Sequence, residues 1–155
     1  MSWLASGNDR RSTVEQLPDI AAPYFVLERS LWDQPHMPAE TLELCRLRLA
    51  QLHRCEVAYA RAGYPLPASK REALECWDTS EQFSAAERAC LSFAEVYAMD
   101  TQALTDEQAA AVKQHVGDAG LVLLIEALGM FDGMIRLSLL WQLPTLGDSS
   151  GEAAR

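Results

Sequence analysis

The sequence predicts an all-α protein of about six helices in a single domain. Ala and Leu are abundant while Val, Ile and Thr are sparse, a balance that favours helices over strands. No run alternates apolar and polar residues for long enough to predict a strand. Capping-box patterns start at Ser69, Ser84 and Thr105, each with Glu or Gln three residues later. At 155 residues, one domain can bury roughly 70% of its unfolded surface.

The N-terminal residues indicate a tail followed by one helix. Residues 1–12 are polar and lack a capping pattern, so we expect a disordered tail. Asp19 can cap a first helix over residues 20–32, with Pro23 tolerated in its first turn. Residues 33–38 form the loop that leads to the next helix.

The longest helical pattern covers residues 40–62 and predicts a central helix. Its apolar residues recur three or four apart and make one buried face: Leu42, Cys45, Leu49, Leu52 and Tyr59. The opposite face carries Glu43, Arg46, Arg48, Gln51 and Arg54. Pro38 suits the start of this helix, and Gly63 suits its end.

The capping patterns predict where the remaining helices start. Ser69 opens a brief helix to about Trp77, and the later patterns predict helices over 85–99 and 106–115. Gly117 ends the second of these, and Asp118 then caps a last helix over 119–142. We expect residues 13–144 to form the single domain and 145–155 to form a disordered tail.

Charge and hydropathy restrict the classes of partner and location. A formal net charge of −9 argues against nucleic acid and against an anionic membrane surface. The most apolar run, residues 120–141, contains Glu126, Asp132 and Arg136, so it is a poor membrane span. The N-terminus lacks the apolar stretch of a signal peptide. The predicted location is the cytoplasm.

The four cysteines form no recognisable pair. Cys45 and Cys55 are ten residues apart, about 15 Å along a helix, which is too far for a disulfide. Cys45 and Cys90 lie on apolar faces and are expected in the core, whereas Cys76 is the more exposed candidate for a second reactive thiol. No metal-ligand spacing, phosphate loop or serine elbow is present, so we predict no metal and no cofactor.

The segment from Glu43 to Cys55 carries a family resemblance. Glu43, eleven residues and Cys55 resemble the start of the motif of the alkylhydroperoxidase AhpD and carboxymuconolactone decarboxylase superfamily, which continues Cys-x-x-Cys-x-x-x-His. Here the second cysteine is replaced by Ala58 and the histidine by Ala62. The resemblance extends from near Ala22 to Leu143 and includes the stretches 83–89 and 104–107, and Arg136 four residues after Asp132. It implies an AhpD-like helical fold.

The resemblance also implies roles for three candidate catalytic residues. Cys55 matches the first cysteine of the peroxidase branch, whose thiolate attacks a peroxide. Glu43 matches the carboxylate that moves protons, and His53 could replace the imidazole missing at Ala62.

Each of these residues also has a purely structural interpretation. Cys55 suits a small apolar filler. Glu43 lies about 18 Å from Cys55 along an unbroken helix, so it can reach that thiol only if the helix breaks or a neighbouring subunit contributes. Otherwise it is a solvated charge that can pair with Arg46 or Arg48. His53 can simply satisfy hydrogen bonds at a helix bend.

Three functions stay open on these grounds. The first is a thiol-dependent peroxidase (peroxiredoxin-type) that works through Cys55 with an external resolving thiol. The second is a catalytically silent scaffold that binds a small ligand, and the third is a decarboxylase of the carboxymuconolactone type. The expected ligand is a small peroxide or an organic acid. The resemblance implies a homo-oligomer (trimer, hexamer or dimer), and apolar first and last helices are consistent with one.

Overall fold

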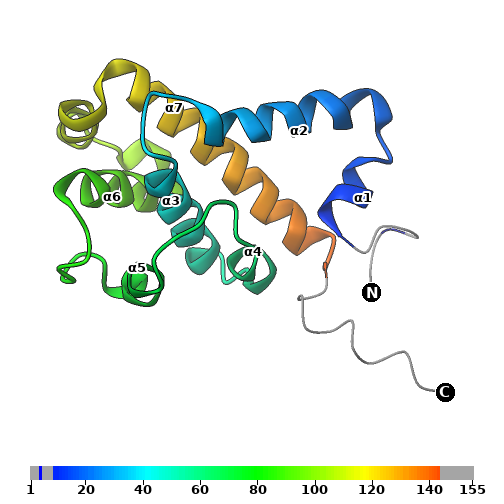
Figure 1. Ribbon diagram of the computed structural model, residues 1–155, viewed down its shortest axis with the longest axis horizontal. Coiled ribbons are helices and arrows are strands. Elements are labelled where there is room, and N and C mark those ends of the chain that lie inside the picture. The colour runs from blue at the N-terminus through cyan, green and yellow to red at the C-terminus, as the bar shows by residue number, and fades with distance from the viewer. Residues whose placement is uncertain (1–3, 5–8, 144–155) are drawn as a thin grey trace.

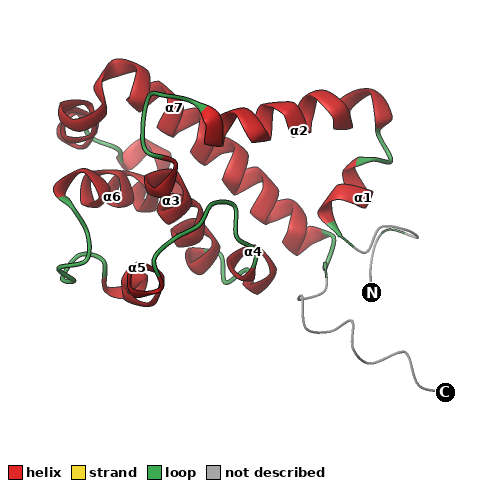
Figure 2. Cartoon of the chain, in the orientation of Figure 1, coloured by secondary structure: helices red, strands yellow, loops and turns green. Residues whose placement is uncertain are grey.

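The computed structural model describes Leu4 and residues 9–143, and this part of the chain is helical apart from its turns (Figure 2). The described residues contain no strand, so the predicted all-α class is confirmed. The elements are α1 (Arg10–Val14), α2 (Pro18–Asp33), α3 (Ala39–Leu52), α4 (Glu56–Ala60), α5 (Ala68–Ala73), the 3-10 helix η1 (Leu74–Cys76), α6 (Ala85–Met99), the 3-10 helix η2 (Thr101–Ala103) and α7 (Asp106–Leu140). None of the helices in the described residues has the length and apolar content needed to cross a membrane.

The core lies where α3, α6 and α7 pack together, while α1 and α2 flank one side of α7 (Figure 1). The innermost side chains come from these three long helices, including Leu44 and Leu47 of α3, Leu91 of α6 and Leu128 and Phe131 of α7. Cys45 and Cys90 are buried among them, as the sequence predicted.

Two of the predicted capping residues are confirmed, and two others do not cap the helices that they were expected to start. Ser84 and Thr105 form complete capping boxes at the starts of α6 and α7. In contrast, α5 starts at Ala68, so Ser69 lies inside it and caps nothing. Helix α2 starts at Pro18, whose fixed φ suits a first helical position, so Asp19 lies in the first turn instead of capping it.

The prediction of one continuous helix over residues 40–62 is wrong, because α3 ends at Leu52 and a separate helix, α4, starts at Glu56. Arg54 has a φ of 53°, in the left-handed region. The N–H of Arg54 bonds to the carbonyl of Gln51 at 3.0 Å, and that of Cys55 bonds to the carbonyl of Ala50 at 2.9 Å. These two bonds define a Schellman ending. An arginine fills the position that glycine usually occupies, and the chain then turns into α4.

The predicted N-terminal tail also needs correction. Asp9 accepts a hydrogen bond from the backbone N–H of Ser12 and so caps α1, which covers residues 10–14. The tail expected at 145–155 lies outside the described residues. The two helices expected over 106–115 and 119–142 form the single element α7, which has a kink at Gly117 (φ 70°) where the break was predicted.

Candidate functional site

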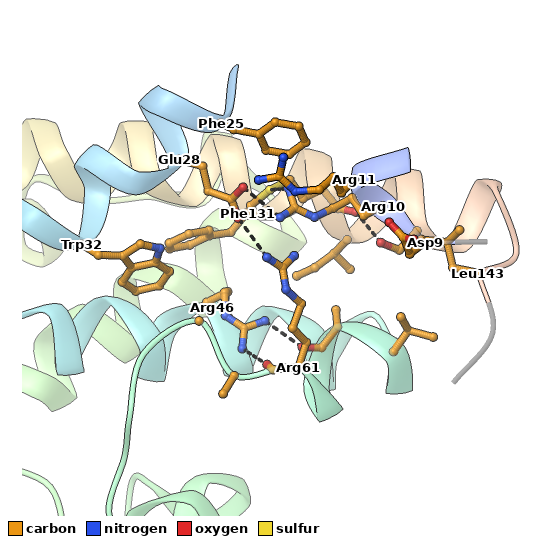
Figure 3. A pocket seen from close by; sticks show the side chains of 17 residues that line it. Asp9, Arg10, Arg11, Phe25, Glu28, Trp32, Arg46, Arg61, Phe131 and Leu143 are labelled. Atoms are coloured by element: carbon orange, nitrogen blue, oxygen red, sulfur yellow. Dashed lines mark hydrogen bonds and ion pairs between the residues drawn. The ribbon is translucent and has the colours of Figure 1, made fainter. Parts of the chain in front are cut away.

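A cavity of about 670 Å³ opens between α1, α2, α4 and α7 (Figure 3). Its apolar walls include Trp32 and Phe131, whose rings stack with centroids 5.5 Å apart. Ala58 and Ala62 also line it. These are the two positions where the resemblance expects a cysteine and a histidine, so the cavity lies beside the motif and two methyl groups replace its reactive side chains.

Glu43 supports the wall of this cavity through a buried ion pair with Arg46. Its carboxylate accepts two hydrogen bonds from Arg46, each 2.7 Å long, and one from the N–H of Gly63 at 3.1 Å. Arg46 in turn donates to the carbonyls of Ala58 at 2.7 Å and Arg61 at 2.5 Å. The side chain of Glu43 is only 1% exposed. Of the structural interpretations of Glu43, pairing with Arg46 is therefore confirmed and the solvated charge is wrong.

The break after α3 is what makes this arrangement possible. Because the chain turns back at residues 53–55, α4 and the segment after it come within reach of Arg46. The guanidinium then bonds two carbonyls near the end of α4 that have no following helical turn to satisfy them. The pair Glu43–Arg46 therefore fixes the backbone that presents Ala58 and Ala62 to the cavity.

Cys55 lies at the start of α4 and is 2% exposed. It does not line the cavity. All four cysteines are free, and Cys76 alone among them is exposed. Burial raises the pKa of Cys45, and burial followed by the charge of Glu87 raises the pKa of Cys90 to about 12. Those two core thiols are therefore held in the unreactive protonated form.

His53 is bound to α7 by a polar contact. Its Nε2 lies 2.6 Å from Oδ1 of Asp132, and Oδ2 of Asp132 accepts a hydrogen bond of 2.6 Å from Nε of Arg136. Asp132 and Arg136 thus form an intrahelical ion pair. His53 does not line the cavity. Of the three candidate residues, Glu43 therefore supports the wall of the cavity, whereas neither His53 nor Cys55 lines it.

Charged side chains gather where α1 and α2 face the end of α4. Arg10 donates two hydrogen bonds to the carboxylate of Glu28, at 2.6 and 2.8 Å, and a third to the sulfur of Met134. Arg61 reaches across the cavity toward the same carboxylate, with its Nη2 3.5 Å from Glu28 (Figure 3). Arg11 lies over the ring of Phe25, 4.3 Å from its centroid.

These lining groups determine what the site can do chemically. No cysteine or histidine is among the described residues that line the cavity, so its walls supply no thiolate and no imidazole. The described residues also contain no group of three His, Cys, Asp or Glu side chains placed to hold a metal ion. What the walls do supply is apolar surface and guanidinium groups, which suit binding of a small molecule.

Sequence reasoning missed most of the cavity wall. Trp32 belongs to no functional pattern in the sequence, and neither do Arg10, Glu28 and Arg61. Arg61 offered one signal, because it directly precedes Ala62, where the resemblance expects the histidine. Arg10 offered none, since it lies in a segment that was expected to be a tail.

Comparison with known proteins bears on the fold. No protein-family model and no curated protein matches the sequence. A solved structure of a protein of unknown function from Agrobacterium tumefaciens, provisionally assigned as the antioxidant defence protein AhpD, is similar over 90% of this chain and 98% of its own, with a TM-score of 0.76 and 16% identity. The chain has the AhpD-like fold.

The debrominase Bmp8 is similar to this chain as well. Its ligand-free structure matches with a TM-score of 0.78 and 16% identity, over 88% of this chain and 76% of its own. A variant with one cysteine replaced by alanine, in complex with 2,3,4-tribromopyrrole, matches over the same shares with a TM-score of 0.78 and 15% identity. At such identities these similarities describe the arrangement of the helices.

Proposed function

We propose that this AhpD-like protein binds a small, mostly apolar molecule in the cavity beside Ala58 and Ala62. One observation carries the proposal: the two motif positions that lack reactive side chains line a cavity of about 670 Å³. The stacked rings of Trp32 and Phe131 contribute to its apolar surface, and a few polar groups converge on it, which is the usual construction of a small-molecule site.

The buried pair Glu43–Arg46 supports this proposal. Burying an ion pair costs desolvation free energy. This pair holds the turn that follows α4, and that turn forms part of the cavity wall. Bmp8 supports it as well, because its cysteine-to-alanine variant forms a complex with a small aromatic compound. Loss of a cysteine is thus compatible with ligand binding in a chain of similar fold.

The test is a binding screen followed by amide NMR on the full chain. A panel of small aromatic compounds, neutral and charged, should include ligands that shift the amide signals of Ala58, Ala62 and Gly63. Ala58→Phe fills the cavity and should abolish these shifts, whereas Ala60→Phe, on the exposed side of α4, should leave them unchanged. A panel without any ligand for this cavity, or full binding by Ala58→Phe, would contradict the proposal.

Thiol-dependent peroxidase activity through Cys55 is the second candidate. The observation that favours it is the position of Cys55, which is the N-cap residue of α4 and lies one turn before the cavity-lining Ala58. The thiolate would attack one peroxide oxygen, the O–O bond would break with release of an alcohol, and two equivalents of an external thiol would reduce the sulfenic acid. Against it stand the burial of Cys55 and the commitment of Glu43 to Arg46.

Intact mass and peptide mapping after brief treatment with dilute peroxide separate the two candidates. If ligand binding is the function, Cys55 should oxidise no faster than the core thiols Cys45 and Cys90. Selective oxidation of Cys55, together with peroxide turnover that Cys55→Ser abolishes, would establish the peroxidase instead. Exposed Cys76 serves as the internal reference for an accessible thiol.

We also propose that the chain forms a homo-oligomer through α2 and α7. Exposed large apolar side chains occur on both helices: Ile20, Val26 and Leu27 on α2, and Val122, Ile125, Leu139 and Leu140 on α7. Apolar surface of this kind commonly marks an interface. Light scattering at micromolar concentration should give a multiple of the chain mass of 17.2 kDa, and the mass of a monomer would contradict it.

The cytoplasm remains the location that we propose. Four free cysteines, three of them buried in the core, are consistent with a reducing compartment. Fractionation of the source cells with an antibody against the chain tests this directly, and recovery outside the cytoplasm would contradict it.

A further inference from the structure

We propose that the cavity selects a small carboxylate with an apolar body, and that Arg61 is the residue that recognises the carboxylate group. This inference rests on the proposed ligand-binding function and adds the chemical class of the ligand. It follows from how the charges around the cavity are paired.

Most of the charged groups around the cavity are already neutralised. Arg46 is paired with Glu43, and Arg10 holds Glu28 through two short hydrogen bonds. Arg11 forms an ion pair of 3.0 Å with Glu15 on the surface of α1. Each of these arginines therefore has its own carboxylate.

Arg61 is different, because the described residues give it no carboxylate of its own. Its closest acidic partner there is Glu28, at 3.5 Å, beyond the 2.7–3.2 Å of an ordinary hydrogen bond. Arg10 already engages both oxygens of that carboxylate. The side chain of Arg61 is 51% exposed, so its guanidinium can still be reached by a ligand.

The electrostatic surroundings of Arg61 favour an added negative charge. Partial burial lowers its pKa, and the nearby positive charge of Arg10 lowers it further. A ligand carboxylate would offset this unfavourable potential. Asp9 also lines the cavity, and its carboxylate caps α1 by accepting a hydrogen bond from the N–H of Ser12.

A buried polar group beside Arg61 also lacks a partner. Within the described residues, Nε of Arg10 is the one buried side-chain nitrogen or oxygen that makes no hydrogen bond. Buried donors without an acceptor are rare in proteins, so a ligand oxygen that reached this Nε would satisfy an otherwise unpaired donor. Arg10 lines the same cavity, so an acceptor oxygen bound there would lie near both guanidinium groups.

The rest of the cavity determines the body of the ligand. Val57, Phe131 and Ile135 present apolar atoms, and the neighbouring Ala58 and Ala62 add only methyl groups. Such walls cannot satisfy many polar atoms. A single carboxylate attached to an aromatic or aliphatic body therefore fits better than a sugar or a polyol.

Isothermal titration calorimetry with benzoate and its neutral analogue benzamide tests the inference on the full chain. Wild-type protein should bind benzoate roughly tenfold more tightly than benzamide, because a charge-assisted hydrogen bond is stronger than a neutral one. Arg61→Gln should remove this preference while leaving benzamide binding unchanged. Arg61→Lys should retain part of it.

The matched control is Arg29→Gln, an identical change at an exposed position of α2 that does not line the cavity. It should keep the benzoate preference within about twofold. Equal binding of the two probes, or a preference that survives Arg61→Gln, would overturn the role of Arg61 and leave ligand binding intact. If neither benzoate nor benzamide binds, and the panel of aromatic compounds also yields no ligand, both the ligand-binding function and the role of Arg61 would be overturned.

Discussion

Two cavities lie on either side of α2 and α7, and they differ in how they are built. The first, of about 670 Å³, is lined by four arginines and two carboxylates in addition to its apolar walls. The second, of about 350 Å³, is lined by apolar side chains, Tyr97, Gly129 and one acidic residue, Glu126. Glu126 is exposed, whereas Glu43, which supports the first cavity, is buried.

This difference indicates which cavity can orient a ligand. Gaps of some size arise wherever helices of unequal length pack together, and apolar walls alone do not select a ligand. The first cavity adds guanidinium groups held in place by the buried Glu43–Arg46 ion pair and by the hydrogen bonds from Arg10 to Glu28. Fixed polar groups of this kind supply orientation and specificity.

The largest effect is expected at the ion pair that supports the first cavity. Glu43→Ala leaves the guanidinium of Arg46 buried without its partner, which should cost about 3–5 kcal/mol of unfolding free energy. Glu126→Ala is the identical change at the second cavity and should stay within about 0.5 kcal/mol of wild type. Urea denaturation measures both, and equal losses would remove the contrast between the cavities.

A second prediction concerns the close approach of backbone to this ion pair. A Cβ at Gly63 would lie 2.7 Å from Oε2 of Glu43 and 2.8 Å from Cζ2 of Trp32. Gly63→Ala should therefore destabilise the chain by about 1–3 kcal/mol. Gly133→Ala, inside α7 with nothing within 4 Å of the new Cβ, should stabilise it by about 0.5–1 kcal/mol. Thermal denaturation that moves both midpoints in the same direction would contradict this packing.

The smallest effect concerns the break that separates α3 from α4 and so opens the first cavity. Arg54→Gly should stabilise the fold by about 1 kcal/mol, because glycine adopts the left-handed φ of 53° without the steric cost that arginine has there. The same change in a helix interior, Arg29→Gly, should destabilise it by about 1 kcal/mol. Denaturation midpoints give both signs, and destabilisation by Arg54→Gly would show that the break is not of this type.

The sequence was sufficient for the fold class and for most helices because those depend on local patterns. The capping boxes at Ser84 and Thr105 and the break at Gly117 are all set by nearby residues. The break at Arg54 could not be predicted with the same ease, because arginine carries no preference for left-handed backbone. Its conformation is imposed by the packing of α4 against the rest of the fold.

The site was predictable only where it coincided with the motif. Glu43, Ala58 and Ala62 were identified from the resemblance. Ala58 and Ala62 line the cavity, and Glu43 holds its wall through Arg46 and Gly63. Arg10 and Glu28 could not be identified, because they meet only when α1 packs against α2. Long-range contacts of this kind leave no periodic signal in the sequence.

The most direct test of the account is a methionine-methyl NMR titration of the full chain with benzoate. Met134 lines the first cavity and Met130 lines the second, one helical turn apart on α7. If the first cavity is the ligand site, the Met134 methyl signal should shift with saturable binding while the Met130 signal stays in place. A shift confined to Met130 would contradict the account, because the ligand would then occupy the cavity that lacks the arginines.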